Sequence, residues 1–232
     1  MTPLVIIRPE PGAGATEVAA HAMGLDARCY PLFAIRALEW EPVPARDVDA
    51  ILLGSANALR HGGAALETYR GLPAYAVGEK TADAARAAGL DIVATGKGGL
   101  QRVLPDLEPG HRRLLRLAGR ERVELSLPPG VTMTTREVYA SEPLPLPADL
   151  KRLLTAPCVV LLHSGEAAAH FAQCVEASGI DRGTVSLAAI GPRVAERTGD
   201  GWAALHSADE PSDAALLVLA SQMCQDTANR VP

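Results

Sequence analysis

Short apolar runs alternate along this chain with segments in which small apolar residues recur at helical spacing. Several of the runs are continuously apolar, which is typical of parallel strands covered on both faces. The predicted strands are LVII (4–7), AILLGS (50–55), AYAVG (74–78), DIVAT (91–95), RLLRLAG (113–119), CVVLLHS (158–164), LAAIG (187–191) and WAALHS (202–207). The pattern therefore predicts many short, buried strands.

The segments between these runs have the period of helices. The predicted helices are ATEVAAHAMG (15–24), NALRHGGAALETY (57–69), KTADAARAAG (80–89), EAAAHFAQCVEASG (166–179) and SDAALLVLASQMCQ (212–225). Because strands and helices alternate, the sequence predicts an α/β fold with parallel sheets flanked by helices.

Two proline-bearing stretches interrupt the alternation, at residues 37–45 and 141–149. Each follows a strand-like run, and proline favours extended backbone over helix. Domain boundaries often fall in such segments. We therefore expect two similar domains joined by a two-stranded linker, a discontinuous one formed by residues 1–36 and 144–232 and an inserted one formed by residues 37–143.

The two predicted domains repeat one pattern. In each, an apolar strand ends at a serine that opens a helix, Ser55 or Ser164, and the next strand ends at a glycine that does the same, Gly78 or Gly191. The first turn of a helix has unpaired N–H groups and the positive end of the helix dipole, and both favour anions. The repeat predicts a ligand with several negative groups, held between the domains.

Composition removes several classes of function. A net charge of −5 and 3% aromatic residues do not fit a nucleic-acid surface, which needs basic and stacking side chains. No apolar run reaches the roughly 20 residues of a membrane span, and the first residues do not read as a signal peptide. We expect a cytoplasmic monomer with no membrane or nucleic-acid partner and a small-molecule ligand.

Metal and nucleotide sites are also disfavoured. The four cysteines and six histidines form no Cys-x-x-Cys, His-x-His or His-Glu-x-x-His motif, so neither a metal site nor a disulfide is predicted. The glycine-rich stretches PGAGAT (11–16) and TGKGG (95–99) match neither nucleotide-binding pattern.

Several small motifs occur in an order that resembles one family. They are Arg8 in IIRP, Ser55 with Asn57, Gly78 with Thr81, Val138 with Tyr139, Gly191 with Pro192, and ADEPSDAALL (208–217). Together they resemble uroporphyrinogen-III synthase over nearly the whole chain. The chain departs from that pattern at Gly54 and His163, where the family often has a hydroxyl residue, and at Val194, in place of a frequent threonine.

The resemblance implies a reaction. Enzymes of this family close the linear tetrapyrrole hydroxymethylbilane to uroporphyrinogen III, inverting ring D and losing water, in the route to haem. It implies a cofactor-independent, cyclising hydro-lyase. It also makes hydroxymethylbilane synthase a candidate partner that hands over the substrate. The alternative is a catalytically silent tetrapyrrole- or polyanion-binding or sensory module of the same fold.

The resemblance, the internal repeat and the positions of basic residues after strands together supply candidate site residues. The resemblance places Tyr139 near the leaving hydroxyl as the catalytic residue; the competing interpretation is a structural tyrosine on the linker strand. The candidate substrate-binding residues are Arg8, Ser55, Asn57, Gly78, Lys80, Thr81, Arg120, Ser164, Gly191 and Arg193. For Ser55 and Thr81 the competing interpretation is a plain helix cap, and for Arg120 and Arg122 a solvated basic turn.

Overall fold

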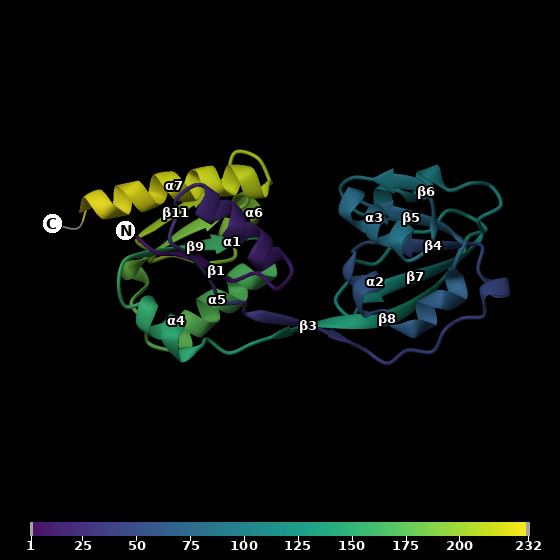
Figure 1. Cartoon of the computed structure of the whole chain (residues 1–232), viewed down its shortest axis with the longest axis horizontal. Coiled ribbons are helices and arrows are strands. Elements are labelled where there is room, and N and C mark those ends of the chain that lie inside the picture. The colour runs from purple at the N-terminus through teal and green to yellow at the C-terminus, as the bar shows by residue number, and fades with distance from the viewer. Residues whose placement is uncertain (1, 231–232) are drawn as a thin grey trace. The chain divides into compact units, whose positions relative to one another are not determined.

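The computed structural model describes residues 2–230, which form two compact units (Figure 1). The first unit contains the residues up to Ala34 together with those from Glu142 onward, and the second runs from Ile35 to Ser141. The chain passes from one unit to the other after Ala34 and again after Ser141. The sequence predicts these passages after residues 36 and 143, two residues later in each case. Each unit has its own sheet and its own core.

The first unit is built on a five-stranded sheet of order β11-β10-β9-β1-β2 with parallel pairing. Its strands are β1 (Leu4–Ile6), β2 (Ala27–Cys29), β9 (Cys158–Leu162), β10 (Val185–Ala189) and β11 (Ala204–Ser207). Its helices are α1 (Gly12–Ala22), α4 (Ala148–Leu153), α5 (Gly165–Ala177), the 3-10 turn η5 (Arg182–Thr184), α6 (Pro192–Ala195) and α7 (Asp213–Arg230).

Both faces of this sheet are covered, which explains why β9 is apolar throughout. Val160 and Leu162 pack with Phe171 of α5 on one face. Leu161, which points the other way, packs with Leu216 of α7 on the opposite face. Side chains alternate along a strand, so a strand with helices on both sides must be apolar at every position.

The second unit is built on a six-stranded sheet of order β3-β8-β7-β4-β5-β6. Its strands are β3 (Phe33–Ala37), β4 (Ala50–Leu53), β5 (Pro73–Val77), β6 (Asp91–Gly96), β7 (Arg113–Gly119) and β8 (Thr132–Pro143). Its helices are α2 (Asn57–His61), α3 (Glu79–Ala87) and the 3-10 turns η1 (Ala45–Asp47), η2 (Ala64–Tyr69), η3 (Leu100–Arg102) and η4 (Leu104–Asp106). The neighbouring strands β3 and β8 are the two that cross the boundary between the units.

The predicted class, α/β with parallel sheets flanked by helices, is confirmed, but one predicted helix is wrong. Residues 57–69 form α2 and then the 3-10 turn η2, separated at Gly62 and Gly63. Gly63 has φ +67° and ψ −165°, a conformation open mainly to glycine and outside the helical region. The indole N–H of Trp40 donates to the carbonyl of Gly62 at 2.9 Å, which also holds the break. The short elements β2 and α4 were not predicted.

Candidate functional site

A small pocket in the second unit lies where β4 and β7 end. Ligands in open α/β sheets bind beyond the carboxyl ends of parallel strands, so this is the expected position for a site. Its volume is about 150 Å³, and its lining residues are Gly54, Ser55, Leu100, Arg116, Leu117, Ala118, Gly119, Glu121, Arg122 and Tyr139. Two of the predicted residues, Ser55 and Tyr139, therefore come together.

Tyr139 lies on β8 with its ring against the backbone of Gly119. A Cβ atom at Gly119 would lie 2.7 Å from Cε2 and Cζ of Tyr139, so only glycine allows the ring to pack there. The ring of His61 is tilted against it, with 6.3 Å between the ring centroids. Within residues 2–230, the Tyr139 hydroxyl makes no hydrogen bond. It is therefore free to bind a ligand.

Ser55 lines this pocket and lies just before Ala56, the N-cap residue of α2. Its Oγ accepts a hydrogen bond from the backbone N–H of Asn57 at 3.2 Å, which leaves the hydroxyl proton available to donate. The side chain of Asn57 is engaged elsewhere, because its Oδ1 accepts from Arg60 Nη1 at 3.1 Å. Ser55 thus holds the turn that leads into α2 and is also placed to contact a ligand.

The sequence interpretation missed Arg116, the buried charged residue of this pocket. Arg116 lies on the central strand β7 and is only 7% exposed. Its Nη1 donates to the carbonyl of Val123 at 2.8 Å, while its Nε has no hydrogen-bond partner. Burial, and then the charge of Arg122, lowers the pKa of Arg116, and nearby Tyr139 opposes this. A charge in the middle of a largely apolar strand was the signal in the sequence.

The basic turn after β7 is partly neutralised. Arg122 Nη1 lies 2.7 Å from Glu137 Oε1, and Arg120 Nε lies 3.8 Å from Glu137 Oε2. Arg122 lines the pocket but the predicted residue Arg120 does not, and its backbone N–H donates to the carbonyl of Tyr139. Arg120 is thus a neighbour of the pocket.

The glycine-to-helix turn at Gly78 also lies in the second unit. Gly78 has φ +77° and directly precedes α3. Within the described residues, the backbone N–H groups of Glu79 and Lys80 make no hydrogen bond, as expected for a first helical turn. The Lys80 side chain is exposed, while Thr81 is only 5% exposed and lies in the third helical position rather than at the cap. This turn offers backbone donors more than side chains.

The corresponding turn of the first unit is weaker. Gly191 has φ 179°, an extended conformation open to any residue, and the helix α6 that follows contains four residues. Ser164 is the N-cap of α5 and accepts from the N–H of Ala167 at 3.2 Å. Both units therefore have a glycine between a strand and a helix, but the two turns differ in backbone conformation and in the length of the helix that follows.

Arg193 lines a broad hollow of about 580 Å³ in the first unit. Arg197 and His170 share the hollow, as does Glu166. Arg193 and Arg197 are four residues apart, and neither makes an ion pair within the described part of the chain. The hollow is therefore a second region with free cations, and Arg197 is a residue that the sequence interpretation missed.

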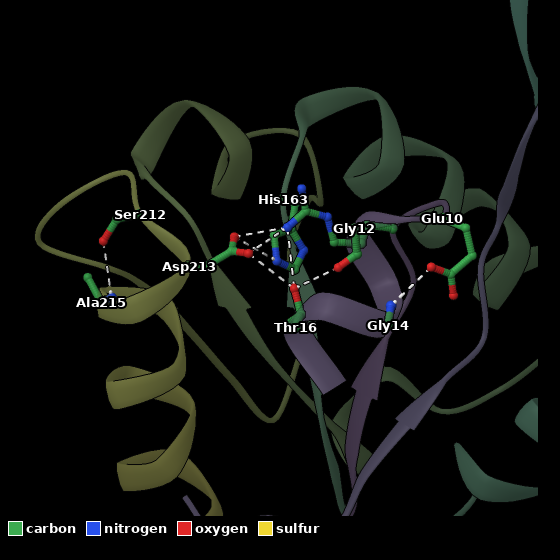
Figure 2. Close-up of polar contacts among 9 residues, drawn as sticks. Glu10, Gly12, Gly14, Thr16, His163, Ser212, Asp213 and Ala215 are labelled. Carbon is green, nitrogen blue, oxygen red and sulfur yellow. Dashed lines mark hydrogen bonds and ion pairs between the residues drawn. The ribbon is translucent and has the colours of Figure 1, made fainter. Parts of the chain in front are cut away.

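Arg8 forms a polar cluster at the ends of β1 and β9. Its Nη1 lies 2.9 and 2.8 Å from the two carboxylate oxygens of Asp213, the first residue of α7. Thr16 Oγ1 lies 3.2 Å from the same carboxylate and donates to the carbonyl of Gly12 at 3.0 Å (Figure 2). Arg8 would therefore reach a ligand only by sharing or leaving Asp213.

His163 is buried beside this cluster (Figure 2). Its side chain is 6% exposed, and neither ring nitrogen makes a hydrogen bond within the described residues. Nε2 lies 3.5 Å from Asp213 Oδ1. Burial, and then the charge of Arg8, lowers the pKa of His163 to about 4, although Asp213 opposes this. The imidazole is therefore neutral at pH 7.

Neither a metal cluster nor a membrane-spanning helix occurs in the described part of the chain. Across residues 2–230, no group of three or more histidine, cysteine, aspartate or glutamate side chains is placed to hold a metal ion. Within the same residues, no helix is both long enough and apolar enough to span a bilayer.

Comparison with known proteins decides the family. The sequence model described as "Uroporphyrinogen-III synthase HemD" matches residues 15–218. The chain belongs to the uroporphyrinogen-III synthase family. Members of this family act in tetrapyrrole synthesis, and the match includes the whole pocket of the second unit but not Arg8. No curated protein sequence gives a significant match.

Solved structures of uroporphyrinogen-III synthases share the fold. The enzyme from Helicobacter pylori is 17% identical, with a TM-score of 0.66 over 96% of this chain and 100% of that one. A mutant of the enzyme from Thermus thermophilus is 16% identical, with a TM-score of 0.55 over 97% of this chain and 99% of that one. At these identities the likeness concerns the fold.

Proposed function

We propose that this chain converts hydroxymethylbilane to uroporphyrinogen III, with inversion of ring D and loss of water. The observation that carries the proposal is the unbonded hydroxyl of Tyr139, which lines one pocket with Ser55 and the buried Arg116. A phenol that is free to donate suits assistance to a departing hydroxyl, and a cation suits a carboxylate.

The proposed sequence of steps needs no cofactor. The phenol of Tyr139 donates a hydrogen bond or a proton to the hydroxyl of the substrate, which leaves as water and gives an azafulvene. Ring D attacks through its substituted carbon, forming a spiro intermediate that fragments and recloses with the ring inverted. Loss of a proton then restores the pyrrole. The sum is dehydration, so no oxidant, reductant or strong protein nucleophile is required.

Orientation supplies the selectivity in this proposal. The reactive pyrroles provide their own electron density. The protein therefore has to hold the bilane in a conformation in which closure with inversion of ring D is faster than closure without inversion. A chain of net charge −5 must hold a polycarboxylate through local donors. The backbone N–H groups of Glu79 and Lys80, the hydroxyl of Ser55 and the guanidinium of Arg193 are such donors. We place the reaction in a cytoplasmic monomer that is supplied by hydroxymethylbilane synthase.

The direct test is the isomer of the product. The protein is mixed with hydroxymethylbilane, the products are oxidised, and the type I and type III porphyrins are separated. We expect type III to dominate, with type I only in a reaction that lacks the protein. If the protein yields only type I, it is a catalytically silent binding module.

A milder effect is expected at the hydroxyl residues. We predict that Ser55→Ala or Thr81→Val weakens transition-state binding by about 0.5–1.5 kcal/mol, the worth of one ordinary hydrogen bond. The loss of kcat/KM is then roughly two- to tenfold, because backbone N–H groups carry most carboxylate contacts. Steady-state kinetics on variants with unchanged melting temperature measure it. Complete loss of activity would show that these side chains dominate binding.

A further inference from the structure

Arg116 is a buried cation without an anion. It is 7% exposed in the centre of the second unit's sheet, and no carboxylate among residues 2–230 forms an ion pair with it. Its neighbour Arg122 is different, because it lies 2.7 Å from Glu137. A buried charge without a partner is costly, whereas guanidinium stays protonated at any ordinary pH. Arg116 therefore favours any anion that can enter its surroundings.

The hydrogen bonds of Arg116 leave one edge of the guanidinium free. Nη1 is held by the carbonyl of Val123 at 2.8 Å. Nε has no partner, and the side-chain hydrogen bond that Arg116 donates within the described residues is from Nη1, not Nη2. Nε and Nη2 lie on the same edge of the planar group, and this edge can bind both oxygens of one carboxylate.

The pocket that Arg116 lines suits a small carboxylate group. Its volume of about 150 Å³ exceeds the roughly 30 Å³ share of one water molecule in the liquid. That is enough for a carboxylate with one or two methylene groups. Glu121 also lines the pocket but is exposed. Nε itself is shielded from solvent, so binding of both oxygens requires the groups that cover it to move.

We propose that Arg116 binds one acetate or propionate group of the tetrapyrrole substrate, holding it in the pocket that also contains Ser55 and Tyr139. This inference rests on the proposed function for the identity of the substrate. Arg116 is then a positioning residue: it fixes one carboxylate while the Tyr139 hydroxyl, in the same pocket, meets the reacting end. The carboxylate supplies the anion that the free protein lacks.

Replacing Arg116 is expected to affect the stability of the free protein and its binding of carboxylates in different ways. Arg116→Met keeps a long apolar side chain and removes the uncompensated charge, so the melting temperature of the free protein is expected to stay the same or rise. Binding of a carboxylate is expected to weaken. If Arg116 only anchors Val123, the same change lowers the melting temperature and leaves carboxylate binding unchanged.

The test uses the full chain and sodium propionate at constant ionic strength, with the neutral propionamide as a comparison. Wild type is expected to melt at higher temperature as propionate increases, because a ligand of the folded state stabilises it. Arg116→Met is expected to lose this response. The matched control Arg112→Met removes an exposed arginine outside this pocket, next to the other end of β7, and is expected to keep it.

Kinetics with hydroxymethylbilane provide the second measurement. We expect Arg116→Met to raise KM at least about tenfold, the worth of one hydrogen bond to a charged group, with a smaller effect on kcat. If Arg116→Met does not fold, Arg116→Lys replaces it, because lysine keeps the charge but cannot bind both oxygens along one edge. A propionate response equal to wild type in the variant tested, or no response in wild type, overturns the inference.

The two proposals can fail separately. If propionate stabilises the protein through Arg116 but only the type I isomer forms, the carboxylate subsite stands and the proposed reaction falls. If type III forms in wild type and in Arg116→Met with equal KM, the reaction stands and the subsite falls.

Discussion

Tyr139→Phe is expected to lower kcat for formation of uroporphyrinogen III about 100-fold, while KM changes little. Phenylalanine keeps the ring that packs on Gly119 and beside His61, and it removes the one group of Tyr139 that can donate a proton. General acid assistance contributes roughly 10²- to 10⁴-fold. We expect the low end, because an electron-rich pyrrole expels a hydroxyl readily. The loss falls on kcat because the interaction strengthens as the hydroxyl leaves.

The matched control for this prediction is Tyr69→Phe. The hydroxyl of Tyr69 donates to the carbonyl of Val43 at 2.9 Å in the core of the same unit. Its removal is expected to lower the melting temperature and to leave kcat unchanged. Steady-state kinetics and thermal unfolding of both variants make the comparison. Wild-type kcat in a folded Tyr139→Phe protein would reduce Tyr139 to a structural residue.

The first unit is expected to lose stability in mild acid because of His163. In the folded protein the pKa of His163 is lowered to about 4, against an ordinary value of 6.5. The groups that face it are Arg8 and Asp213, with Thr16 bonded to that carboxylate. Between these two pKa values the unfolded chain binds a proton that the folded chain does not, so stability falls as pH falls. The loss is on the order of 2 to 3 kcal/mol between about pH 7 and pH 4.

The two tryptophans allow the units to be followed separately. Trp202 lies in the first unit and Trp40 in the second, so Trp40→Phe leaves a fluorescence signal from the first unit alone. Urea unfolding of this protein, with and without His163→Gln, measures the pH dependence. Glutamine does not titrate, so its curve should lack the His163 contribution. In a Trp202→Phe background, which reports on the second unit, the substitution should have no effect. If the free energy of unfolding of the first unit has the same pH dependence with and without His163→Gln, the prediction is contradicted.

Secondary structure followed from local patterns where burial makes every position apolar. The run CVVLLHS contains β9, from Cys158 to Leu162, whose residues are all buried because both faces of its sheet are covered. The predicted helix over residues 57–69 failed for the opposite reason. Its break lies at Gly62 and Gly63, and the indole of Trp40, 22 residues away, donates to the carbonyl of Gly62. A window of neighbouring residues cannot contain that contact.

The same distinction holds for the candidate site. Ser55 and Tyr139 could be proposed from sequence because each belongs to a short motif in the family's order, and the structure brings them into one pocket. Their contribution to substrate binding and catalysis stays a prediction. Arg116 carried only a weak signal, a charge in the middle of a largely apolar strand, whereas Arg120 and Arg122 stand out in the turn that follows.

The sequence alone determined the α/β class, the repeated strand-to-helix turns and the resemblance to one family, since these depend on residues close together in the chain. The tertiary structure decided which charges have partners. Arg8 meets Asp213 across 205 positions, and His163 is neutral because folding buries it beside that pair. Arg116 has no ion-pair partner among residues 2–230, although acidic residues follow it in the sequence. Burial and pairing of charges depend on three-dimensional distance and on exclusion of water, and neither is a property of a local sequence pattern.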